Sequence, residues 1–413
     1  MQLKNFIFVS FLIFSLGYTA SCWGMDHKTT GTAKSFNLDE FLTQVQKSSP
    51  DLEIENAASN EAASKARGIR LPPPMLGLML MNDGSGRNQG LEFSQEIPFP
   101  SKIFKEKEIR SLDADSQKAG AAYRKQFVIH QARVAYLQYW SAFEKQKIIL
   151  QKLEWLKSHA RISKSTSRSD SSAQIHLLGV ESEVDRAENE AEEVQSLVIE
   201  KSAALNLFVP DLKTDGLEPL LPPLEKQKIQ KHWPLSQKTS AVLWKESEAK
   251  SAQLMRDLKK QAYLPDFFVR YRAYNGNDQS SKSSELMLGI TLPFLYFWQP
   301  QAEVSELEAR NLKAQSQLRQ AEAESSSKLQ SLNSRIESLS RQLQNLKDKL
   351  LPRAHRRMKL VENLSARTME ALNDHRSVML DYLELQFKAI ELRMDLETSQ
   401  SEFMALTEKG SSS

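Results

Sequence analysis

The feature that constrains the fold most is a long run without helix breakers. From Ser101 to Ile162 the sequence contains no proline, and its only glycine is Gly120. A continuous helix over this run would be roughly 90 Å long, because an α-helix rises about 1.5 Å per residue. A rod of that length cannot bury its apolar side within one small core, so it must lie against other helices. The sequence therefore predicts an elongated protein of long, packed helices.

Two shorter helical runs can supply that cover. Residues 51–70 are rich in Ala and Glu, which favour helix, and residues 172–208 are helical again after a polar interruption. Their summed length nearly equals that of the long run. We therefore expect them to be stacked end to end along it.

A later helix carries a heptad seam, in which apolar residues are spaced alternately by three and four positions. This spacing is typical of a coiled coil. A soluble coiled-coil dimer would account for the seam, but it would not explain why hairpins lie between the helices. The seam consists of Leu329, Leu332, Ile336, Leu339, Leu343, Leu346 and Leu350.

The order of parts repeats along the chain. Residues 36–209 form a first half and residues 235–406 a second, each with a short helical region, a hairpin, a long helix and a returning helix. The linker at 210–234 is rich in proline and is expected to be a loop. Residues 407–413 form a short tail. Internal repetition on this scale predicts a pseudo-symmetric structure.

The hairpins, at about 71–98 and 265–293, contain strands with one apolar face. Side chains alternate between apolar and polar in three of the four strands, whereas Met75–Met81 does not alternate cleanly. Each run is near the roughly 9–11 residues that a tilted membrane strand needs. We expect one face to contact the membrane; a soluble hairpin packed on the helices is the alternative. The residues assigned to the membrane face of the last strand are Leu286, Leu288 and Ile290.

The amino terminus is typical of a secretory signal. Lys4 precedes the apolar run Phe6–Leu16, which is too short for a comfortable membrane span, and small residues follow. We expect residues 1–22 to be a signal peptide. Cys22 is the only cysteine, so no disulfide can form within one chain. It stands where the signal should be cut, and the residues leave open whether it is lipidated or incidental.

Composition argues against several classes of protein. The 413 residues are too many for one compact core of ordinary size. The net charge is only +3, and charges of both signs are mixed along the helices, which does not favour nucleic-acid binding. A mean hydropathy of -0.49 does not fit a helical multi-pass membrane protein.

No catalytic constellation is present in the sequence, and we expect neither enzyme activity nor a cofactor. The histidines are widely spaced, and none pairs with another His or Cys at a metal-ligand spacing. Met75, Met79 and Met81 resemble a soft-metal cluster, but methionine on a strand is more often simply apolar, so no metal site is assigned. The basic run Arg353–Arg357 is expected to be a solvated helix face. The seven histidines are His27, His130, His159, His176, His232, His355 and His375.

Three segments, taken in order, resemble the outer-membrane factor (TolC) family. The second is most similar to members of heavy-metal export systems of the cobalt–zinc–cadmium type. The family often has a glycine where this chain has Ser101. It usually has a glycine where this chain has Asn373–His375. The second departure bears on the geometry of a helical turn. The segments are Phe36–Leu42 with Ser49–Leu52, Phe93–Lys102, and Leu350–Ala354 with Leu380–Gln386.

The resemblance implies a mainly α fold with a small membrane β part. Four strands per chain cannot close a barrel, whereas a homotrimer would supply twelve. The long coiled-coil helices would continue the pore as an α-barrel in the periplasm. Such channels sit in outer-membrane lipid and are passive exit ducts for small molecules or metal ions, served by an inner-membrane pump through a periplasmic adaptor. The alternative function is a periplasmic structural coiled-coil protein without a pore.

Two polar interruptions, at about Ser165–Ser172 and Ala371–Ser377, separate each long helix from its returning helix. Their composition suits exposed turns, and the length of the helices places them far from the hairpins. In a trimer, six such turns would form one ring at the periplasmic tip, where a tube can narrow and an adaptor can dock. The residues assigned to this gate and contact are Arg168, Asp170, Asp374 and Arg376.

Overall fold

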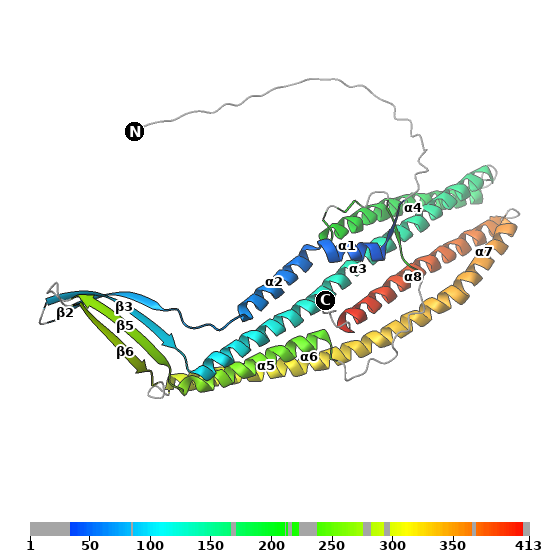
Figure 1. Ribbon diagram of the computed structural model, residues 1–413. Coiled ribbons are helices and arrows are strands. Elements are labelled where there is room, and N and C mark those ends of the chain that lie inside the picture. The colour runs from blue at the N-terminus through cyan, green and yellow to red at the C-terminus, as the bar shows by residue number, and fades with distance from the viewer. Residues whose placement is uncertain are drawn as a thin grey trace, which may run out of the picture.

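The molecule is elongated, with a small sheet at one end and long helices running to the other (Figure 1). This arrangement confirms the predicted fold class of long helices with a small β part. None of the helices in the described part of the chain combines the length and apolarity that a membrane crossing requires. The computed structural model describes residues 34–83, 86–166, 171–210, 212–213, 217–222, 238–275, 282–292, 298–365 and 369–407.

Helix α3, Pro100–Thr166, is continuous over the run that lacks helix breakers. Helix α2, Pro50–Ala66, packs along its first part and α4, Ser171–Ala204, along its last, as the end-to-end stacking predicts. Helix α2 ends earlier than residue 70 because Gly68 adopts a positive φ of 76°, which glycine tolerates and a helix does not. A 3-10 turn, Leu205–Leu207, follows α4.

The second half supplies the other cover of α3. Helix α5, Ser240–Lys260, packs on both α3 and α6, Trp298–Asn345. Helix α8, Met369–Thr407, returns along α3 and α6. Helix α5 begins with the Thr239 side chain accepting a hydrogen bond of 3.3 Å from the backbone N–H of Val242, which satisfies one of the free N–H groups at a helix start.

The heptad seam of α6 packs against α8, but its register changes near the end. Leu346 is buried, whereas Leu350 is 41% exposed and Leu351 takes its place against α8. Residues Leu346–Leu350 form a π-helical turn, whose wider winding rotates the following residues relative to the seam. The turn precedes Pro352 in α7, Leu351–Ser365, because the proline ring cannot fit an ordinary helical turn. The prediction that Leu350 continues the seam is therefore wrong.

A mixed core joins the two halves at the middle of the molecule. Strand β1, Lys34–Asn37, pairs in parallel with β4, Leu217–Leu220, beside α1, Leu38–Ser48. The linker is therefore not a loop throughout, because it contributes strand β4. Pro219 is tolerated in this strand, since both strands of a two-stranded sheet are edge strands and the missing N–H interrupts no central hydrogen-bond ladder. Asn37 occupies the N-cap position of α1, although its side chain makes no capping hydrogen bond.

The four remaining strands form one antiparallel sheet in the order β2-β3-β5-β6. The two hairpins lie side by side, since β3 of the first pairs with β5 of the second. Strands β2 and β6 are its edges. The strands are β2, Met75–Asp83; β3, Gly86–Ile97; β5, Phe267–Asn275; and β6, Lys282–Ile290.

Tyr136 of α3 ties the mixed core together and generates a test of the fold. Its ring is fully buried, its hydroxyl donates to the Phe36 carbonyl, and it accepts a hydrogen bond of 3.1 Å from the Leu220 N–H. Burial raises the pKa of Tyr136, so the hydroxyl stays a neutral donor. Tyr136→Phe leaves buried backbone groups unsatisfied, and we expect it to cost about 1–3 kcal/mol of stability.

The measurement is the thermal unfolding midpoint of the purified protein in detergent. Tyr263→Phe is the matched control, because Tyr263 is more than a third exposed, and it should leave the midpoint unchanged. Equal midpoints for the Tyr136 variant and the unaltered protein would contradict the role given to this hydroxyl.

Candidate functional site

The sheet has one face that is apolar across all four strands. The strand register brings Leu78 beside Leu91, and Val269 beside Leu288. Strand β2, whose pattern looked irregular, contributes alternate leucines to this face. The exposed fractions reach 85% at Leu78, so nothing in the described part of the chain covers the face. Its large exposed residues are Leu76, Leu78, Leu80, Leu91, Phe93, Phe267, Tyr271, Leu286, Leu288 and Ile290.

The opposite face of the sheet carries a network of charges. The Glu92 carboxylate lies 3.2 Å from Nε of Arg270 and 2.8 Å from Nε of Arg272, and Arg272 also lies 3.8 Å from Glu285. Phe268 covers Gly289, where a Cβ would lie 2.2 Å from the ring. The sheet therefore presents apolar side chains on one side and paired charges on the other. This arrangement suits an apolar environment on the first side and water on the second.

A salt bridge fixes the sheet to the helices. Lys102, in the first turn of α3, lies 2.8 Å from Asp266 just before β5, and both are mostly buried. The same Asp266 carboxylate accepts a hydrogen bond of 2.8 Å from the Phe99 N–H. Because the partners come from the two halves of the chain, this contact sets how both hairpins leave the helical body.

The far end of the helices contains only part of the predicted gate. Arg168 and Asp170 lie outside the described residues, as does Cys22 at the amino terminus. Asp374 is exposed near the start of α8, and the prediction of a turn over Ala371–Ser377 is wrong, because these residues already belong to the helix. Arg376 is not a free side chain, because its guanidinium forms an ion pair of 3.0 Å with Glu183 of α4. The roles assigned to these four residues stay predictions.

Three histidines that the sequence separates meet at this end of the molecule. His159 of α3 is 3% exposed, and its ring lies 5.9 Å from that of His176 on α4. Trp155 stacks obliquely on His159 at 5.3 Å and contacts His375 of α8 edge-on at 5.5 Å. The sequence did hold one signal for this cluster, since each histidine lies within about three helical turns of a polar interruption.

The cluster keeps His159 uncharged. Burial, then the nearby His176, Arg376 and His375, lower the pKa of His159 to about 4. Its Nε2 atom is buried and has no hydrogen-bond partner among the described residues. Over the described ranges, no group of three or more His, Cys, Asp or Glu side chains is placed to hold a metal ion. The cluster is therefore a packing contact among α3, α4 and α8 that a proton can weaken.

Comparison with known proteins gives matches in structure alone. No protein-family model matches the chain. No curated protein matches it either. The outer-membrane channel OprN matches with a TM-score of 0.74 at 12% identity, over 89% of each chain. CusC, whose structures concern transmembrane channel formation, matches with a TM-score of 0.73 at 12% identity, over 92% of this chain and 94% of its own.

The Campylobacter jejuni outer-membrane channel CmeC matches with a TM-score of 0.72 at 12% identity. That match covers 97% of this chain and 96% of CmeC, so it includes both the helices and the sheet. At these identities the likeness shows the fold. The chain therefore shares its architecture, over nearly its whole length, with proteins described as outer-membrane channels.

The histidine cluster makes the tip sensitive to acid. The folded state holds His159 neutral, whereas the unfolded chain takes up its proton near pH 6.5, so stability is fully present above pH 6.5 and falls as the pH drops toward 4. The loss is at most about 3 kcal/mol. We expect the thermal midpoint of His159→Phe to fall less between pH 7 and pH 4.5 than that of the unaltered protein.

His355→Phe serves as the matched control, because His355 packs on Tyr382 of α8 away from the cluster. It should keep the acid sensitivity of the unaltered protein. If His159→Phe and His355→Phe show the same pH profile, the cluster is not the source of that sensitivity.

Proposed function

We propose that the chain is a subunit of an outer-membrane efflux channel of the outer-membrane factor (TolC) family. It is a passive exit duct for small molecules or metal ions. The observation that carries this proposal is the sheet, which has one largely apolar exposed face and, within the described residues, two open edges. A water-soluble protein rarely leaves so large an apolar patch uncovered. The shared architecture with outer-membrane channels supports the same conclusion.

The open edges favour a homotrimer. In lipid, every backbone N–H and C=O must be paired, so β2 and β6 cannot stay free within the hydrocarbon. Pairing β6 of one copy with β2 of the next removes both edges. Three copies supply twelve strands, which suffice for a closed barrel in outer-membrane lipid.

The two faces of the sheet would then have separate roles. The apolar face, which includes Leu286, Leu288 and Ile290, would contact lipid. The face with Glu92, Arg270 and Arg272 would line a water-filled pore, where ion pairs stay hydrated. Such a channel would conduct and do no chemistry of its own.

The helices would extend the duct into the periplasm. The far turns would meet a periplasmic adaptor, which links the channel to an inner-membrane pump. Asp374, with Arg168 and Asp170, would form the gate and this contact, while Arg376 would hold α8 to α4 through Glu183. The similarity of Phe93–Lys102 to heavy-metal exporters favours metal ions as the cargo. Deletion of the gene tests this branch. If the cells tolerate zinc, cobalt and cadmium as well as before, the result argues against it.

Arginine at position 288 tests the membrane face. Leu288→Arg puts a charge on the apolar face of β6, and we expect it to destabilise the inserted barrel by about 2–4 kcal/mol. The measurement is the fraction of trimer extracted from outer membranes in detergent. That fraction should fall sharply relative to the unaltered protein.

Met287→Arg is the matched control, because Met287 is the neighbouring residue and lies on the other face of the sheet. It pairs with Arg270 across the strands, and its face also carries Glu92 and Glu285. It should assemble nearly normally. A monomer that stays folded in detergent without the substitution would refute the channel itself and would favour the periplasmic coiled-coil protein. Equal assembly of the two variants would instead reverse the assignment of faces.

A cysteine at Asp374 tests the orientation of the helical end. In a Cys22→Ser background, Asp374→Cys should form a crosslink with the adaptor in intact cells, because Asp374 is exposed where the duct would end. Ser283→Cys, exposed in β6 at the other end of the molecule, is the control and should not. Crosslinking at residue 283 without crosslinking at residue 374 would mean that the duct points the other way.

A further inference from the structure

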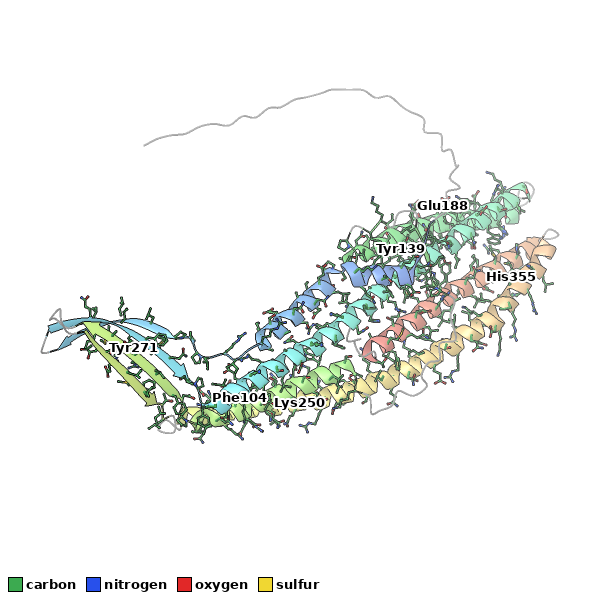
Figure 2. The ribbon with its side chains drawn as sticks, viewed as in Figure 1. Phe104, Tyr139, Glu188, Lys250, Tyr271 and His355 are labelled. Atoms are coloured by element: carbon green, nitrogen blue, oxygen red, sulfur yellow. The ribbon has the colours of Figure 1, made fainter. Side chains whose placement is uncertain are left out.

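A groove runs along the helices in their half nearest the sheet. Helix α3 packs there between α2 and α5, and α5 packs between α3 and α6, so the four helices form one layer. Figure 2 shows Phe104 of α3 and Lys250 of α5 in this half, whereas His355 lies toward the other end. All four helices line the groove, whose volume of about 850 Å³ would accommodate a small organic molecule.

The groove lies on the concave side of this layer. Along α3, Asp113 accepts a hydrogen bond from Ser251 of α5, and Lys125 donates one to Asn56 of α2. At about 100° per residue, these two contacts lie roughly 120° apart around α3, and Arg110, which lines the groove, falls between them. The helices on either side of α3 therefore bend toward the groove. In a closed tube of helices the concave side is the inside, so the groove would face the lumen.

The floor of the groove consists of short side chains. All four helices contribute at least one alanine or serine to it, and Met255 of α5 adds further apolar surface. Such a floor can contact the apolar body of a bound molecule without obstructing it. The alanines that line the groove are Ala58, Ala62, Ala114, Ala252 and Ala314.

The acidic side chains that line the groove all have partners within the chain. The Glu61 carboxylate lies 2.5 Å from the ammonium of Lys65, and that of Glu248 lies 2.7 Å from Lys245. The Asp113 carboxylate accepts the hydrogen bond from Ser251. These acids are therefore already engaged and compete little for a positive charge across the groove.

Three basic side chains of the groove have no such partner. Arg70, between α2 and β2, and Arg310 and Lys313 of α6 are exposed, and none of them forms an ion pair with another described residue. Because Arg70 follows α2 and the other two belong to α6, they stand at the two sides of the groove. The groove therefore combines an apolar floor with positive charge that the chain itself does not neutralise.

We propose that this groove binds an organic anion on the wall of the duct. The ligand is a small molecule with an apolar body and a carboxylate, sulfonate or phosphate group. The alanine floor contacts the apolar body, and Arg70, Arg310 and Lys313 hold the negative group by charge-assisted hydrogen bonds.

This inference rests on the proposed channel, because only a closed tube turns the groove into part of a lumen. Within that function it specifies the class of cargo. The three bases repel a bare metal cation, so the groove favours small anionic molecules over metal ions. It therefore weighs against the metal-ion cargo that the similarity of Phe93–Lys102 favours.

Equilibrium binding of a dye tests the site. Fluorescein is the probe, because its dianion combines an apolar ring system with a carboxylate, and the cationic dye rhodamine 6G is its counterpart. Fluorescence anisotropy with the purified protein in nanodiscs should report binding of fluorescein and not of rhodamine 6G. The combined variant Arg70→Gln, Arg310→Gln, Lys313→Gln should raise the Kd for fluorescein roughly tenfold.

Arg310→Gln and Arg319→Gln form a matched pair. Both arginines are exposed on α6, and at about 100° per residue they lie on opposite sides of the helix. Arg310→Gln should weaken the binding of fluorescein, whereas Arg319→Gln should not. Equal affinities in the two single variants, or full affinity in the combined variant, would overturn the proposal.

Ion selectivity tests the place of the groove. In planar bilayers under a KCl gradient, the combined variant should favour potassium over chloride more than the unaltered protein does, because its lumen has lost positive charge. Arg319→Gln should leave the reversal potential unchanged. A shift caused by Arg319→Gln but not by the combined variant would put the groove on the outside of the tube and would overturn the proposal.

The outcomes separate this proposal from the function on which it rests. The groove is formed within one copy of the chain, so the binding of fluorescein can be measured whether or not the chain trimerises. A trimer that conducts but binds fluorescein no better than rhodamine 6G overturns only the anion site. A chain that binds fluorescein through these bases but never conducts refutes the channel, and with it the place of the site on the wall of a duct.

Discussion

The rest of the structure depends on the need to cover α3. Its 67 residues form a rod of about 100 Å, and no compact core can enclose the apolar side of such a rod. Helices α2 and α4 line it from the first half of the chain, and α5 and α8 line it from the second. The mixed core at Tyr136 then joins the halves at the middle, because Leu383 and Ile390 of α8 pack into the same cluster as α1, β1 and α3.

This extended design leaves the sheet of a single chain exposed. In the sheet, an apolar face is exposed and two edge strands lack partners. A compact monomer would bury or pair such groups within itself. The Lys102–Asp266 contact keeps the sheet in fixed relation to the helices.

Local pattern predicted most of the elements correctly. The lack of breakers from Ser101 to Ile162 gave the long helix, and the period of two gave the sheet faces, because both are properties of neighbouring residues. Errors arose where one residue changes the phase of a pattern. Pro352 is accommodated by a π turn, which moves Leu351 into the place expected for Leu350. Strand β2 looked irregular because methionine on its polar face hides the alternation that its leucines follow.

The sequence by itself determined that this chain folds as long helices with two amphipathic hairpins, because helix length and side-chain alternation are set by local spacing. Only the tertiary structure brought together His159, His176 and His375, or placed α4 and α7 on opposite edges of the helical layer. Those features depend on which helices become neighbours. Packing along α3 determines which helices become neighbours. The residues that pack together are far apart in the sequence, so no local periodicity predicts them.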